Sequence, residues 1–231
     1  MSTISYARFQ FPPTVIQHAV WLYLRFNLSL RDVEDLLAER GLDVSYETVR
    51  RWVARFGTAY AKRLRERRPR PDDRWHLDEM FVSIGGRRMY LWRAVDAEGE
   101  VLGILVQPRR DKRAAMKLLR RLLKRQGAVP STVTTDKLGS YRAALRDLGL
   151  ANRQVTGGRS NNRAENSHQP VRRRERCWIG FKDPGTTQRF LYAHAAVYNA
   201  FNLQRHLISR YHMKLHRAAA LAQWKVVAGF A

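Results

Sequence analysis

Three acidic side chains, far apart along the chain, stand at positions where a carboxylate needs a partner. Asp78 lies in the run Trp-His-Leu-Asp-Glu-Met-Phe, which otherwise suits a buried strand. A buried carboxylate there is unfavourable unless it is paired or bound to a metal ion. Asp136 ends the β-branched run Val-Thr-Thr, and Glu165 lies near the start of a later helical segment. Residues at strand ends of open α/β sheets face the site crevice, and neighbouring parallel strands would put both aspartates on one rim, against which the helix carrying Glu165 can pack.

Such a cluster of carboxylates supports chemistry at phosphorus. Oxygen ligands suit Mg²⁺ or Mn²⁺, and the ions relieve the repulsion between the acids. Two ions roughly 3.5–4 Å apart activate a water or a 3′-hydroxyl and stabilise the leaving oxygen during in-line attack. We therefore expect Asp78, Asp136 and Glu165 to be the catalytic and metal-binding residues, holding two Mg²⁺ (or Mn²⁺) ions.

Each acid also has a simpler interpretation. Asp78 suits a surface acid of an edge strand, and Glu79 beside it is an alternative ligand, although strand alternation sends the two side chains to opposite faces. Asp136 alone suits a helix N-cap, and Glu165 alone suits a solvent-facing helix residue.

The hydrophobic periodicity of the central part of the chain predicts an α/β domain. We expect strands over residues 75–83, 88–96, 101–107 and 131–135, and helices over 111–126 and 140–148. Of the other acids here, Asp96 suits a hairpin and Asp111 a helix cap. Asn161 or Asn162 is expected to cap the helix that carries Glu165, and Pro170 to kink it about two turns in. Three antiparallel strands, a helix, a fourth strand and further helices are the order of a ribonuclease-H-like domain.

The N-terminal part predicts a helix-turn-helix. Residues 13–26 have helical spacing of apolar side chains, and Ser29 and Ser45 each precede a further helix. The outward-facing residues of the last helix are Tyr46, Glu47, Arg50, Arg51 and Arg55. The second helix of such a motif normally enters the major groove, so we expect these residues to bind DNA. The alternative is a small packing unit with a solvated basic face.

A basic, proline-bearing stretch that ends near residue 71 separates these parts. We therefore expect an all-α helix-turn-helix domain with a basic linker over residues 1–71 and a ribonuclease-H-like catalytic domain over 72–185. C-terminal helices are expected over 186–231, the first of them long and covering 186–209.

Composition agrees with a nucleic-acid partner. The 231 residues carry a net charge of +23, which is typical of proteins that neutralise a polyanion. A hydrophobic share of 45% and six Trp exclude a disordered basic tail. Cys177 is the only cysteine, so no disulfide forms within the chain. No apolar run is long enough for a membrane span, and we expect a cytoplasmic protein with no membrane partner.

An arginine cluster follows Glu165 closely. Its members are Arg172, Arg173, Arg174 and Arg176. We expect them to bind DNA phosphates near the acids, the alternative being a solvated charge run. Trp178 and Phe181 then suit either a hydrophobic anchor or stacking on an unpaired base. His168 suits packing or hydrogen bonding more than a contact to DNA or to a metal-bound water.

Five segments together resemble a known family. They are Leu28-Ser-Leu-Arg-Asp-Val-Glu-Asp-Leu-Leu-Ala-Glu-Arg-Gly41, Trp75-His-Leu-Asp-Glu79, Tyr90-Leu-Trp-Arg-Ala-Val-Asp96, Thr135-Asp-Lys137, and Asn161-Asn-Arg-Ala-Glu-Asn-Ser-His-Gln-Pro-Val-Arg-Arg-Arg-Glu-Arg176 with Gly180-Phe-Lys182. The chain resembles bacterial insertion-sequence transposases of the acidic-triad (DDE) superfamily, specifically the compact replicative family that is numbered six in the classification of insertion sequences. The last segment is the most specific of the five.

The resemblance implies that Asp78, Asp136 and Glu165 are the catalytic acids and that Arg172, two helical turns after Glu165, accompanies them. It implies strand transfer at terminal inverted repeats into target DNA, and synapsis of two ends implies a homodimer or higher oligomer at the nucleoid. Only 28 residues separate Asp136 from Glu165, fewer than is usual, which leaves Glu175 as an alternative third acid. A structure-selective nuclease and a non-catalytic DNA-binding regulator remain alternative functions.

Overall fold

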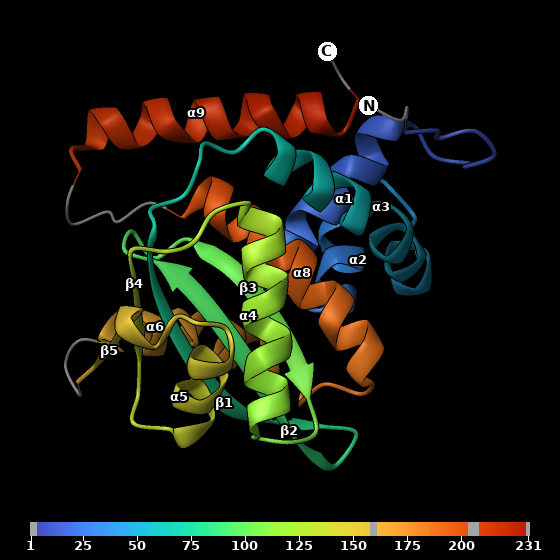
Figure 1. Cartoon of the computed structure of the whole chain (residues 1–231). Helices are drawn as coiled ribbons and strands as arrows, with labels where there is room; N and C mark the ends of the chain where they lie inside the picture. The colour runs from blue at the N-terminus through green and yellow to red at the C-terminus, as the bar shows by residue number, and fades with distance from the viewer. Residues whose placement is uncertain (1–3, 158–160, 203–207, 230–231) are drawn as a thin grey trace. The chain divides into compact units, whose positions relative to one another are not determined.

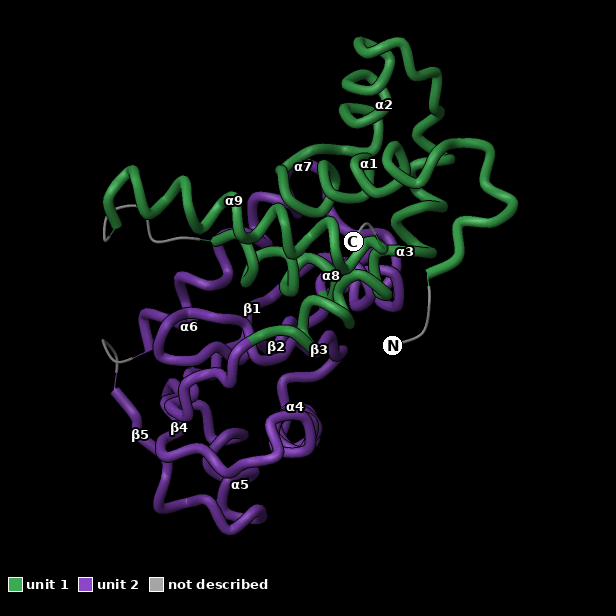
Figure 2. The backbone as a smooth tube through the Cα atoms, turned by 90° about the horizontal axis from the view of Figure 1, so that it is seen from above, with its two compact units in different colours: residues 1–68, 192–231 green, residues 69–191 purple. Residues whose placement is uncertain are grey.

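The computed structural model describes residues 4–157, 161–202 and 208–229, and the chain forms two compact units (Figure 2). The first unit combines Met1–Arg68 with Tyr192–Ala231, and the second is Pro69–Leu191. The C-terminal segment expected over residues 186–231 is therefore shared between the units. Helix α8 (Pro184–Phe201) carries residues of both, and of the expected helix over 186–209, residues 203–207 lie outside the described chain.

The first unit is helical because capping residues precede segments whose apolar side chains recur at helical spacing. Helices α1 (Pro13–Arg25), α2 (Leu30–Ala38), α3 (Tyr46–Glu66) and α9 (Arg210–Val227) contribute to it. Ser29 and Asp32 form a reciprocal capping box at the start of α2, and the hydroxyl of Ser45 accepts the backbone N–H of Thr48 at the start of α3. Both predicted helix starts are confirmed.

The two ends of the chain meet within this first unit. The Tyr6 hydroxyl donates to the backbone oxygen of Ala228 at 2.6 Å, and the indole N–H of Trp224 donates to Gln17 at 2.7 Å. Trp224 also lies edge-on against Tyr60 of α3. The last helix therefore completes the hydrophobic core that α1 and α3 begin.

The second unit is built on a five-stranded sheet within the described residues, in the order β3-β2-β1-β4-β5 (Figure 1). The strands are β1 (Arg74–Ile84), β2 (Arg87–Asp96), β3 (Val101–Gln107), β4 (Thr132–Thr135) and β5 (Gln154–Thr156). The first three pair antiparallel, whereas β4 pairs parallel with both β1 and β5. Gly85 and Gly86 join β1 to β2 with φ of 57° and 75°, as a tight two-residue hairpin turn requires.

Strand alternation divides the side chains of β1 between two cores. Trp75 and Leu77 face α4 (Lys112–Gln126) and α5 (Gly139–Asp147), and α4 lies across that face in Figure 1. Met80 and Val82 face the opposite core, which includes Val171 of α7 (Gln169–Cys177). The unit is thus a ribonuclease-H-like α/β core with flanking helices, as predicted. β5 and the 3₁₀ turn before it (Ala151–Arg153) were not predicted.

The helix expected to carry Glu165 is interrupted. It forms α6 (Asn162–Ser167), and α7 starts at Gln169. Pro170 has no backbone N–H to continue the helical ladder, so the break beside it confirms the predicted kink. Within the described ranges, no helix combines the length and apolar character needed to cross a membrane.

Candidate active site

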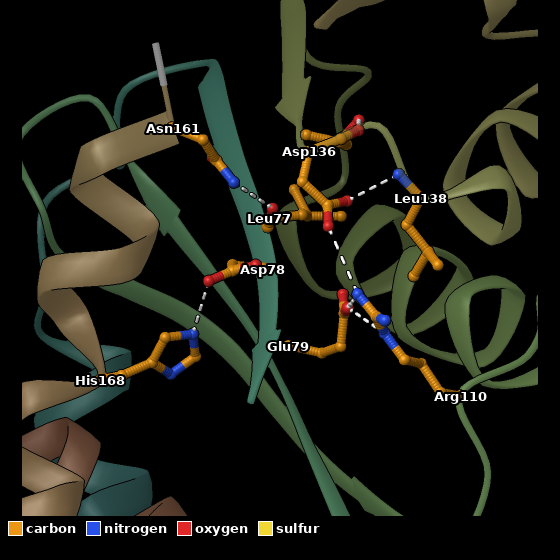
Figure 3. Close-up of polar contacts among 9 residues, drawn as sticks. Leu77, Asp78, Glu79, Arg110, Asp136, Leu138, Asn161 and His168 are labelled. Atoms are coloured by element: carbon orange, nitrogen blue, oxygen red, sulfur yellow. Dashed lines mark hydrogen bonds and ion pairs between the residues drawn. The ribbon is translucent and has the colours of Figure 1, made fainter. Parts of the chain in front are cut away.

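Two of the predicted acids come together where β1 and β4 run side by side. Leu77 of β1 is in register with Thr135 of β4, so the next residue of each, Asp78 and Asp136, lies at the same place in the sheet. Ligand oxygens of Asp78, Glu79 and Asp136 all lie within 4.8 Å of one another (Figure 3). The expectation that parallel strands would bring Asp78 and Asp136 together is confirmed.

Asp78 is oriented by a histidine. Its Oδ2 lies 3.0 Å from Nε2 of His168, the residue between α6 and α7, and both side chains are largely buried. Burial lowers the pKa of His168, and the positive charges of Arg93 and Arg172 act in the same direction, whereas the contact with Asp78 opposes them. His168 thus hydrogen-bonds within the protein, as the simpler interpretation of the sequence predicted.

Glu79 points from the opposite face of β1 and reaches Arg110. The guanidinium donates from Nε to Oε1 of Glu79 (Figure 3). The pKa of Glu79 is raised to about 7, chiefly by burial and to a smaller extent by the charge of Asp136, while Tyr141 and Arg110 act in the opposite direction. Its second oxygen, Oε2, is buried, and the fully buried hydroxyl of Tyr141 lies close to this carboxyl.

This raised pKa has a measurable consequence in protein kept free of divalent ions by a chelator. Between pH 4.5 and about 7 the folded state retains the Glu79 proton that the unfolded state loses. Stability therefore falls as the pH rises through this window. We expect the free energy of unfolding of Glu79→Gln, minus that of the unsubstituted protein, to increase from pH 5 to pH 7 in urea titrations. A difference that stays constant with pH would contradict the raised pKa.

Asp136 is held by the loop that follows it. Its Oδ1 accepts the backbone N–H of Leu138 at 3.0 Å, just before α5, and its Oδ2 lies 3.5 Å from Nη2 of Arg110. The helix-capping alternative is therefore met only in part, because α5 begins at Gly139 with Leu138 at its cap position. The two competing acids, Asp96 and Asp111, serve the hairpin and the α4 cap as predicted.

Glu165 is exposed on α6 and is not a member of the three-carboxylate group found among the described residues. The short helix that carries it is nevertheless fastened beside Asp78 at both ends. The Asn161 side chain, expected to cap the helix, instead donates to the backbone oxygen of Leu77 at 3.0 Å, and His168 binds Asp78. Six residues of helix span only about 9 Å, so the whole of α6 lies near this part of β1.

Glu175, the alternative third acid, is engaged elsewhere. Its Oε1 accepts the backbone N–H of Ser83 at 3.2 Å, and its Oε2 pairs with Arg172 at 2.8 Å. Ser83 lies five residues beyond Asp78 on β1, which is about 16 Å along an extended strand. Because the helix is interrupted at His168, the two-turn spacing no longer fixes Arg172 on the face of Glu165.

The arginine cluster is divided between the surface and the interior. Arg173 and Arg176 are exposed and Arg172 is partly exposed. Arg174 is only 2% exposed and lies over the rings of Trp178 and Phe190, so its position does not present the guanidinium to a phosphate. The Trp178 ring lies 4.4 Å from Phe190 and also contacts Phe181, which confirms the hydrophobic-anchor interpretation.

The residues singled out in the helix-turn-helix are at the surface. Tyr46, Arg50, Arg51 and Arg55 are all exposed. Arg50 pairs with Glu47, Arg51 donates to the Thr48 hydroxyl at 3.1 Å, and Arg31 of α2 lies 5.0 Å from the Tyr46 ring centroid. This face of α3 is therefore basic and accessible within its own unit.

The acidic cluster fits a divalent metal site by its donor set. It offers hard carboxylate oxygens from two neighbouring strands, all within 4.8 Å of one another. Oxygen ligands are those that Mg²⁺ and Mn²⁺ prefer. The chemistry that the sequence predicted is thus compatible with the geometry.

Comparison with known proteins agrees with the family that the sequence motifs indicate. A family model described as a DDE domain, of the IS240 transposase type, matches residues 72–204. The chain is 34% identical over 178 residues to the transposase of the insertion sequence-like element IS431mec from Staphylococcus aureus strain Mu50, covering 74% of this chain and 79% of that protein. Its identity to the S. aureus transposase of IS257 in transposon Tn4003 is 33% over the same shares.

Among solved structures, a chain of the simian T-cell lymphotropic virus intasome in complex with PP2A regulatory subunit B56 gamma matches with a TM-score of 0.41 and 16% identity, over 60% of this chain and 51% of that one. The family match spans more than half of the chain, and the S. aureus relatives align over most of it. The chain therefore belongs to the DDE transposases of insertion sequences, which are metal-dependent polynucleotidyl transferases acting on DNA.

Proposed function

We propose that Asp78, Asp136 and Glu165 together hold two Mg²⁺ or Mn²⁺ ions and that this transposase nicks the ends of an insertion sequence and joins them to target DNA. The observation that carries the proposal is the meeting of Asp78 and Asp136 from two parallel strands. Glu165 is included because of the family motif and because α6 is fastened to β1 beside Asp78.

The chain's own residues fix the geometry of the acids. His168 holds one oxygen of Asp78, the backbone N–H of Leu138 holds one oxygen of Asp136, and Asn161 anchors the start of α6. The second oxygen of Asp78 is left for other ligands, and that of Asp136 lies 3.5 Å from Nη2 of Arg110. Bound divalent ions would activate the attacking hydroxyl and stabilise the leaving oxygen. Such orientation matters because small displacements of catalytic groups cost large factors in rate.

The basic surfaces supply the DNA contacts of the proposal. Tyr46, Arg50, Arg51 and Arg55 read the terminal inverted repeats, and Arg172, Arg173 and Arg176 bind phosphates near the acids. Arg174 is left out because it is buried. Two ends must be brought together, so the active form is a homodimer or higher oligomer, for which the helices over 186–231 are the proposed interface. The protein acts at the nucleoid of the cell.

A strand-joining assay tests this function directly. Purified protein, Mg²⁺, labelled terminal-repeat DNA and a supercoiled target are incubated, and joined products are separated from nicked ones. We expect joined products that depend on Mg²⁺ or Mn²⁺. Nicking without joining would indicate a nuclease, and binding without either reaction would indicate a regulator.

The exposed face of α3 gives a separate expectation for DNA binding. Arg51→Ala should weaken binding to terminal-repeat DNA about tenfold in fluorescence anisotropy, as expected for loss of an arginine contact. If Arg51 contacts phosphate, the substitution weakens binding to scrambled DNA as much as binding to the terminal repeat, and the magnitude of the slope of log K against log salt concentration falls by about 0.9. If Arg51 contacts a base, only binding to the terminal repeat weakens. Lys225→Ala removes the same charge from an exposed position on α9 and should have little effect, and equal effects of both variants would contradict the assignment.

A further inference from the structure

A cationic side chain already reaches into the acidic cluster. Arg110 precedes the α4 cap residue Asp111, and its guanidinium contacts both Glu79 and Asp136. It bonds Oε1 of Glu79, and its Nη2 lies 3.5 Å from Oδ2 of Asp136 (Figure 3). Arg110 therefore contacts two of the three clustered carboxylates, and one of these, Asp136, belongs to the proposed metal site.

The surroundings of Arg110 allow its side chain to rotate away from the acidic cluster. Its side chain is 44% exposed, while the Glu79 side chain that it contacts is 1% exposed. Asp111 anchors the neighbouring backbone through the N–H of Ala114, so rotation of the arginine side chain needs no change in the helix. By contrast, Arg93 is fully buried opposite Asp78 in the β1–β2 ladder and cannot move without disturbing the sheet.

Because both are positively charged, the Arg110 guanidinium and a divalent ion are alternative partners of the acidic cluster. Carboxylates within 4.8 Å of one another repel, and one guanidinium supplies a single positive charge against them. A divalent ion supplies more charge in a smaller volume, and carboxylate oxygens such as those of Asp136 are the ligands that it prefers. A guanidinium and a metal ion cannot both lie against the same carboxylate oxygens, because their positive charges repel and the ligand positions coincide.

We propose that Arg110 is an exchangeable internal counter-ion of Glu79 and Asp136 that competes with divalent ions for Asp136. It stabilises the cluster before ions bind and swings outward when they arrive. Metal affinity is therefore set partly by the contacts that Arg110 gives up. This inference rests on the proposed metal site and adds a residue that tunes it.

The test compares Mn²⁺ binding by full-length protein, measured by isothermal titration calorimetry. Arg110→Gln should bind Mn²⁺ about tenfold more tightly than the unsubstituted protein, equivalent to about 1.4 kcal/mol. Without metal the variant should melt at a lower temperature, and the difference should shrink at saturating Mn²⁺. Arg113→Gln, which removes an exposed charge from the start of α4, is the matched control and should change neither quantity.

A second measurement separates displacement from simple charge removal. The Arg110 Nε–Hε resonance of the unsubstituted protein, assigned by its loss in Arg110→Lys, should move from an ion-paired to a solvated position when Mg²⁺ is added. An unmoved resonance at saturating Mg²⁺, or equal or weaker Mn²⁺ binding by Arg110→Gln, overturns the inference. Failure of the unsubstituted protein to bind Mn²⁺ would instead count against the proposed metal site itself.

Discussion

The substitutions Asp78→Asn and Asp136→Asn are each expected to reduce strand joining at least about a thousandfold while the protein stays folded. Loss of a carboxylate that holds the ions removes several kcal/mol of transition-state stabilisation, and each 1.36 kcal/mol is tenfold in rate. Asparagine keeps the shape of the side chain and relieves repulsion within the cluster. Joined product should be quantified under single-turnover conditions in Mg²⁺, together with the melting temperature of each variant.

A matched acid shows whether the effect is specific. Asp147 also belongs to the second unit, is exposed and pairs with Lys112 at 2.6 Å. Asp147→Asn should therefore keep activity within about twofold, because exposed ion pairs contribute little to stability. If either cluster variant retained a tenth of the original activity with its fold intact, the catalytic assignment of that aspartate would be wrong.

Glu165→Gln is expected to lower strand joining at least about a hundredfold with no loss of stability, because the side chain is exposed on α6. Glu175→Gln should behave in the opposite way. It weakens the contacts with Arg172 and Ser83 and should cost about 1 kcal/mol of stability, with activity preserved. Urea unfolding and the joining assay on the same preparations separate the two effects.

Glu79→Gln completes this comparison, since Glu79 is the third member of the carboxylate group that the structure brings together. Should Glu165→Gln remain active while Glu79→Gln loses joining, the third ligand is Glu79 and the motif has been assigned to the wrong acid. Loss of activity in Glu175→Gln alone would favour the alternative that the short spacing left open.

The core of the site could be predicted because its cause is local. The alternation around Asp78 and the β-branched run before Asp136 each predict a strand, and a parallel pair brings Asp78, inside β1, beside Asp136, which follows the end of β4. The capping residues Ser29, Ser45 and Asp111 likewise act within one turn of their own helices. These features depend on neighbours in the sequence.

Other features depend on register and tertiary contacts, which sequence patterns do not encode. In the sequence, Arg110 is not distinguishable from the other basic residues around α4. Only the structure shows that Glu79 and Asp136 lie beside it. Asn161 suited a helix cap, and only the position of β1 shows that it binds Leu77 instead. Strand β5 has three residues, too few for any periodicity to reveal.

The first unit is discontinuous, and this affects the order of events during synthesis. Its opening helices leave the ribosome well before α9, which supplies Trp224 and the backbone oxygen that Tyr6 binds. The second unit is a continuous stretch and emerges completely in between. A nascent chain can thus assemble its acidic cluster before the first unit has gained α9, so premature termination near residue 200 would release a protein with its second unit formed and its first unit incomplete.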